Sequence, residues 1–143
     1  MAILNYTTKI APSKTVGEIQ GILAKAGCRK IVTDYDEQGE PSALTFMVPM
    51  QERPVYFALP CNREGVLKAM TRDRKVPRSA CTPAQAQRVA WRIIKDWCEA
   101  QLAIIEAGQA QLAEVFLPYA VTADGHTLFK AIDSGTGTLQ LSR

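Results

Sequence analysis

Positively charged side chains gather in the middle of the chain, and their chemistry suits phosphate. The stretch 63–78 holds six Lys or Arg residues and only two acids. Three more cations, Arg88, Arg92 and Lys95, follow at steps of four and three residues, which return to one face of a helix. Guanidinium groups bind phosphate oxygens through paired N–H donors. If the two sets converge, they form one positive surface. The alternative is a solvated helix face on which Lys95 pairs with Glu99.

A nucleotide offers a base as well as phosphates, so aromatic side chains near these cations are candidate stacking partners. Trp91 precedes Arg92 at the flank of an apolar helix face, and Tyr56 lies in a predicted strand on the side away from the expected core. Both positions are also typical of ordinary packing. The predicted ligand-binding residues are Arg72, Lys75, Arg78, Arg88, Arg92, Lys95, Trp91 and Tyr56.

The sequence lacks the patterns of the common catalytic sites. It contains no phosphate-binding loop, dinucleotide fingerprint, zinc-protease motif or nucleophile elbow. The only histidine, His126, follows Asp124 and Gly125 in a predicted turn. Four acids surround the first predicted hairpin, but not at calcium-loop spacing, so we expect them to be solvated. The sequence therefore predicts a protein that is not an enzyme and that has no metal or cofactor.

The four cysteines, Cys28, Cys61, Cys81 and Cys98, form no C-x-x-C pair. No run of eighteen apolar residues occurs, and the first residues lack the basic-then-apolar order of a signal peptide. We therefore expect a cytoplasmic protein with free thiols and no membrane contact. The net charge of +3 is too small to indicate nucleic acid by itself.

The elements that would position the cations can be read from periodicity. Alternation over residues 4–10 predicts a first strand. Thr15 and Glu18 have the spacing of a capping box, which predicts that a helix begins there and ends at Gly27. Three strand-like runs, at 30–35, 44–48 and 55–59, follow with short links and predict an antiparallel meander.

Two further helices follow the meander in the prediction. Asn62 is suited to cap a short one. Thr82, with Pro83 behind it, is suited to begin a long one that keeps an apolar stripe, including Trp97, to about Gly108. The predicted fold is α+β, an antiparallel meander sheet packed by the N-terminal helix and by this long helix. We assign residues 1–133 to a single domain and residues 134–143 to a flexible tail.

The order helix, three strands, helix over residues 15–70 resembles a double-stranded-RNA-binding domain. That family places a lysine cluster at the start of its final helix, where this chain has only Arg63 and Lys68. Segments 15–20, 34–36, 90–119 and 124–128 resemble a family of small uncharacterised bacteriophage and prophage proteins. The second resemblance implies a small viral accessory protein, such as one that blunts host defence by sequestering a nucleotide signal or by blocking a host protein.

Together these observations predict a non-catalytic phage accessory protein, a homo-oligomer in the bacterial host's cytoplasm. Its predicted partner is an anionic, nucleotide-like small molecule bound at the basic surface. Two alternatives remain open: a protein-binding inhibitor of a host defence enzyme, and a nucleic-acid-binding module with the topology of a double-stranded-RNA-binding domain.

Overall fold

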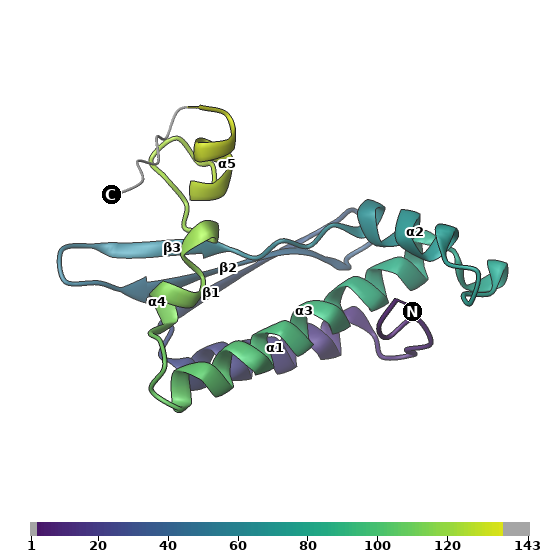
Figure 1. Ribbon diagram of the computed structural model, residues 1–143, viewed down its shortest axis with the longest axis horizontal. Coiled ribbons are helices and arrows are strands. Elements are labelled where there is room, and N and C mark those ends of the chain that lie inside the picture. Colours follow the sequence, from purple (N-terminus) through teal and green to yellow (C-terminus); the bar gives the residue numbers. More distant parts are fainter. Residues whose placement is uncertain (1–2, 136–143) are drawn as a thin grey trace, which may run out of the picture.

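A three-stranded sheet and two long helices form the body of the molecule. The computed structural model describes residues 3–135. Figure 1 shows α1 and α3 side by side on one face of the sheet, with α5 on the other side and α2 at one end. This is the predicted α+β fold. The elements are α1 (Pro12–Ala26), β1 (Lys30–Tyr35), β2 (Pro41–Pro49), β3 (Pro54–Ala58), α2 (Arg63–Arg72), the 3-10 turn η1 (Arg78–Ala80), α3 (Pro83–Glu106), α4 (Leu112–Val115), the 3-10 turn η2 (Leu117–Tyr119) and α5 (Leu128–Asp133).

The strands pair in the order β1-β2-β3, and both pairings are antiparallel, as the meander predicts. In β2 the side chains of Leu44, Phe46 and Val48 are buried, whereas Thr45 and Met47 are half-buried. Successive side chains of a strand point to opposite faces, so the buried residues face α1 and α3. Thr45 and Met47 therefore lie on the face that these two helices leave uncovered, which we call the outer face.

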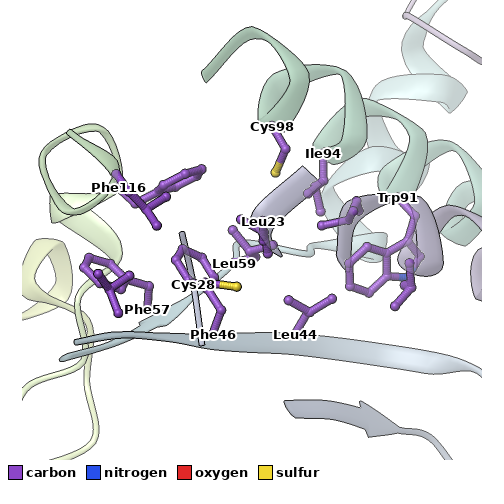
Figure 2. Close-up of a cluster of buried hydrophobic side chains, with 14 residues drawn as sticks. Leu23, Cys28, Leu44, Phe46, Phe57, Leu59, Trp91, Ile94, Cys98 and Phe116 are labelled. Atoms are coloured by element: carbon purple, nitrogen blue, oxygen red, sulfur yellow. The ribbon is translucent and has the colours of Figure 1, made fainter. Parts of the chain in front are cut away.

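Aromatic rings fill the core between the sheet and the helices, and Figure 2 shows them with the aliphatic residues around them. Phe46 stacks on Phe57 with ring centroids 5.2 Å apart and meets the edge of Phe116 at 5.3 Å. Trp97, predicted on the apolar stripe, is half-buried and packs against the edges of Phe116 and Tyr119. The apolar stripe of α3 therefore covers the edge of the core as well as its centre.

The prediction of a strand at residues 4–10 is wrong. This segment turns at Asn5, whose φ is 65°, and Thr8 N–H donates to the Asn5 carbonyl. The Gln85 side-chain amide of α3 donates to the carbonyls of Tyr6 and Thr8, at 2.9 and 2.8 Å. A side-chain amide thus gives this backbone the hydrogen bonds that a neighbouring strand would otherwise supply.

The predicted start of the first helix is also wrong. α1 begins at Pro12, not at Thr15, and its N-cap Ala11 makes no side-chain capping bond. Proline fits the first turn because an N–H there has no partner within the helix. Thr15 lies inside the helix and is buried. The predicted ends and caps elsewhere are confirmed: Gly27 ends α1 with a φ of 111°, and the side chains of Asn62 and Thr82 cap α2 and α3.

Two further sequence expectations meet the structure only in part. No helix within residues 3–135 is long and apolar enough to span a membrane. Of the predicted tail, residues 136–143 lie outside the described residues, and Ser134 and Gly135 follow directly after α5.

Candidate anion-binding site

A second hydrophobic cluster fixes the segment that joins α2 to α3. Val76 is buried in the middle of this segment and clusters with Met70 of α2 and with Ala86 and Val89 of α3. Ile3 and Tyr6 of the N-terminal segment pack on the same cluster. The segment therefore packs on α3, as convergence of the two basic sets requires.

Asp73 holds the backbone at the start of this segment. Its carboxylate accepts hydrogen bonds from the N–H of Lys75 at 3.0 Å and from the N–H of Ile3 at 2.9 Å. The bond from the Lys75 N–H is the largest of the causes that lower the pKa of the Asp73 carboxyl, and the bond from the Ile3 N–H adds to it. Asp73 is thus directed toward backbone donors, and the neighbouring cations make no salt bridge with it.

The cations of this segment are exposed. We call Arg72, Arg74, Lys75 and Arg78 the basic loop. None of the four makes a salt bridge with any residue between positions 3 and 135. A depression beside Arg72 is lined by Ile3, Ala69, Asp73 and Arg74. The basic loop therefore presents four unneutralised charges at the end of the molecule that carries α2 (Figure 1).

The predicted cations on α3 have partners within the fold. Arg92 is half-buried between the helices: its guanidinium contacts the Glu18 carboxylate at 2.5 Å and the Thr15 hydroxyl at 3.4 Å, both on α1. Arg88 donates to the Gln85 side-chain oxygen at 3.0 Å, and Lys95 pairs with Glu99. The Lys95–Glu99 pair is the alternative expected from the sequence. Arg92 therefore joins α3 to α1, whereas the partners of Arg88 and Lys95 lie within α3 itself. Within residues 3–135 no hydrogen bond or ion pair joins these three cations to the basic loop.

Trp91 is not a stacking platform, and this corrects the sequence prediction. Its side chain is fully buried (Figure 2), and its indole N–H donates to the Pro41 carbonyl at 3.1 Å. The buried Gln87 side chain donates to the same carbonyl at 2.7 Å. Two α3 side chains therefore donate to one buried carbonyl at the start of β2, so Trp91 helps to hold the helix against the sheet.

Tyr56 is exposed but stands apart from the cations of α3. It pairs with Met47 across β2 and β3, and 37% of its surface is accessible. It therefore lies on the outer face, so the sheet separates it from α3. The predicted eight-residue site is thus not brought together: Arg72, Lys75 and Arg78 share the basic loop, whereas Arg88, Arg92, Lys95, Trp91 and Tyr56 lie elsewhere.

A small pocket that the sequence did not indicate lies between the β1–β2 turn, the start of α2 and α3. It has a volume of about 150 Å³, and its lining includes Cys61, Arg63, Glu64 and Gln87. Burial raises the pKa of the Cys61 thiol to about 11, so this thiol is protonated at neutral pH and is a poor nucleophile. Arg63 and Glu64, which both line the pocket, pair with each other at 3.5 Å. Its residues come from three separate stretches, so no local motif signals it.

The acidic hairpin has a structural role at its centre. Asp36 accepts hydrogen bonds from the N–H groups of Gln38 and Glu40 at 2.9 and 3.0 Å, which closes the turn. Across residues 3–135 no group of three His, Cys, Asp or Glu side chains is arranged to hold a metal ion.

Comparison of the chain with protein-family models, with curated proteins and with solved structures gives no match in any of the three.

Proposed function

We propose that this chain is a non-catalytic accessory protein that binds a phosphate-bearing anion through the basic loop. One observation carries the proposal: Arg72, Lys75 and Arg78 are exposed and make no salt bridge with residues 3–135, on a segment anchored by Val76. An anchored loop loses little conformational freedom on binding, and its guanidinium groups are free to pair with phosphate oxygens. In the bacteriophage context implied by the sequence resemblance, such a protein sequesters a nucleotide signal of the host.

The proposed ligand is defined by its phosphates more than by its base. The aromatic candidates, Trp91 and Tyr56, are buried in the core and set on the outer face, respectively. Charge recognition without stacking favours ligands with two or more phosphates over monophosphates, because each added phosphate meets another cation of the loop.

Isothermal titration with a nucleoside triphosphate, a cyclic dinucleotide and inorganic triphosphate tests the proposal. The variant R72A/K75A/R78A should weaken binding by about tenfold or more, since three charge-assisted hydrogen-bonding groups are lost. The control variant K9A/K14A/K130A removes the same charge from exposed positions elsewhere and should leave the affinity within about twofold. Equal losses in the two variants, or no binding by the unmodified chain, would contradict the proposal.

The same loop is also suited to a nucleic-acid backbone, which is the second candidate function. Its cations are exposed on the surface, as contact with a continuous phosphate chain requires. In the resemblance to a double-stranded-RNA-binding domain the final helix is α2, which carries only Arg63 and Lys68 near its start, and Arg63 pairs with Glu64. Duplex RNA recognition through that helix is therefore disfavoured. For the loop alone, three phosphate contacts predict a slope of about −2 to −3 for log K against log salt.

Exposed apolar side chains on the C-terminal segment favour a third candidate, inhibition of a host protein. Phe129 of α5 is 59% exposed, and Leu117 of η2 is also exposed. Capture of one host protein at fixed stoichiometry, lost in L117A/F129A and kept in R72A/K75A/R78A, would support this candidate. Capture that is kept in L117A/F129A and lost in R72A/K75A/R78A would instead assign the function to the basic loop.

A further inference from the structure

The two edges of the sheet differ in whether another part of the chain covers them. Along β3 the chain covers its own edge: Val121 N–H donates to the Tyr56 carbonyl at 2.7 Å, and Ala120 bridges to Phe57. Along β1 no strand among residues 3–135 lies beyond the pairing with β2. An uncovered edge presents a row of unpaired backbone donors and acceptors, which is a template for another strand.

The register of the sheet shows which backbone groups of β1 face outward. Leu59 N–H donates to the Leu44 carbonyl, so Leu44 directs its backbone groups toward β3. Neighbouring residues of an antiparallel strand direct theirs the opposite way, so Thr45 faces β1, where its partner is Val32. The backbone groups of Val32 therefore face β2, and those of Ile31 and Thr33 point to the free edge.

We propose that a second copy of this chain pairs with β1 in antiparallel fashion, so that two copies form one continuous six-stranded sheet. Backbone groups at Ile31 and Thr33 must meet each other across the interface. This requirement places the two-fold axis on a residue. Sliding one strand by a single residue would place the axis between two residues and break every bond. With the axis at Val32, Ile31 of each copy bonds to Thr33 of the other.

The side chains of β1 are self-complementary in this register. Lys30 then lies opposite Asp34 of the second copy, twice across the axis, and Val32 lies opposite its own equivalent. These pairs occupy the outer face, where Val32 is 41% exposed in the single chain. Shifting the axis by one residue to either side places Val32 opposite a charged residue, Lys30 or Asp34. Only the central register joins opposite charges and covers the valine.

The helix beside β1 leaves room for the second copy. An open groove of about 560 Å³ runs between α1 and β1, and its α1 side carries Gly17, Gly21 and Ala24. A side-chain carbon added at Gly17 or Gly21 would meet no atom within 4 Å. Small residues on one helix face allow the α1 helices of the two copies to approach closely below the joined sheet.

A charge-reversal series read by sedimentation equilibrium tests this interface on the full chain. The unmodified chain should be a dimer at micromolar concentration. K30D and D34K each create two like-charge pairs across the axis, so the dissociation constant should rise about tenfold or more. The double variant K30D/D34K restores opposite charges and should restore the dimer. A monomeric unmodified chain, or single variants that dissociate no more readily, would overturn the proposal.

A cysteine placed on the axis gives a second, geometric test. The Val32 pair has the close spacing of a non-hydrogen-bonded antiparallel position, with Cα atoms about 4.5 Å apart, which a disulfide spans. V32C should form a covalent dimer under mild oxidation, whereas T45C, on the same outer face but in the central strand, should not. Cross-linking by both variants or by neither would overturn the register. Lys30, Val32 and Asp34 lie outside the basic loop, so these results are independent of anion binding.

Discussion

The α3 cations and the basic loop are alike in sequence and opposite in structure. Arg92 is only 13% exposed and is held between Glu18 and Thr15, whereas Arg72 and Arg78 are exposed and make no salt bridge with residues 3–135. Only the nine residues 79–87 separate the two sets along the chain. The difference teaches that a basic stretch becomes a binding surface only where folding leaves its charges without partners.

The acids near each set explain the difference. Glu18 of α1 faces α3 and neutralises Arg92. Asp73 stands next to Arg72 and Arg74 in sequence, yet its carboxylate accepts from the backbone N–H groups of Lys75 and Ile3. Because the Asp73 carboxylate accepts hydrogen bonds from backbone N–H groups, it fixes the conformation of the basic loop and makes no salt bridge with the cations beside it.

The largest effect that separates the two regions is expected at Trp91, because it is a core residue of α3. W91A should lower the free energy of unfolding by about 3–5 kcal/mol, from lost burial and the cavity left behind. The Pro41 carbonyl also loses one of its two donors. Urea denaturation measures the loss, and W91F, which keeps an aromatic ring, should lose less. A loss below about 1 kcal/mol would contradict the assignment of Trp91 to the core and would leave it available as an accessible stacking residue.

A smaller effect is expected at Arg92. R92M should cost about 1–2 kcal/mol, because Glu18 loses its charged partner while remaining partly buried. A double-mutant cycle with E18Q isolates the pair, and we expect a favourable coupling energy. The matched variant R78M, in the basic loop, should change stability by less than about 0.5 kcal/mol. Equal costs at the two arginines would remove the distinction between the regions.

The triple variant of the basic loop should change the free energy of unfolding only slightly. R72A/K75A/R78A removes exposed charges without internal partners, so its unfolding free energy should stay within about 0.5 kcal/mol per site of the unmodified chain. Thermal denaturation at low and high salt provides the measurement. High salt should slightly stabilise the unmodified chain more than the variant, since like charges repel in the loop. A large loss of stability would show that the loop cations serve the fold.

The smallest effect concerns pH. Hydrogen bonds, first from Lys75 N–H and then from Ile3 N–H, lower the folded-state pKa of Asp73 below its unfolded value of about 3.9. The stability that Asp73 contributes is therefore complete above about pH 5 and is lost as pH falls through the folded pKa. The stability difference between the unmodified chain and D73N should be constant near neutral pH and shrink below about pH 4. A difference that persists in acid would contradict this assignment.

Much of the architecture was predictable because its signals are local. The meander at 30–58, the long helix α3 and the caps at Asn62 and Thr82 agree with expectation. The errors fall at residues 4–15, where local pattern competes with distant partners. Alternation at 4–10 suits a strand, but Gln85, far along the chain, bonds this backbone in place. A threonine with the spacing of a cap is instead buried inside α1.

The sequence by itself determined the secondary structure of the sheet and of α3, and it located the excess of positive charge. It could not determine which charges are free, because that depends on which side chains from distant segments come within a few ångströms. Only the tertiary structure placed Glu18 beside Arg92, aimed the Trp91 indole at the Pro41 carbonyl and put Tyr56 on the outer face. Hydrogen bonds and ion pairs act over such short distances that spacing along a chain does not predict them.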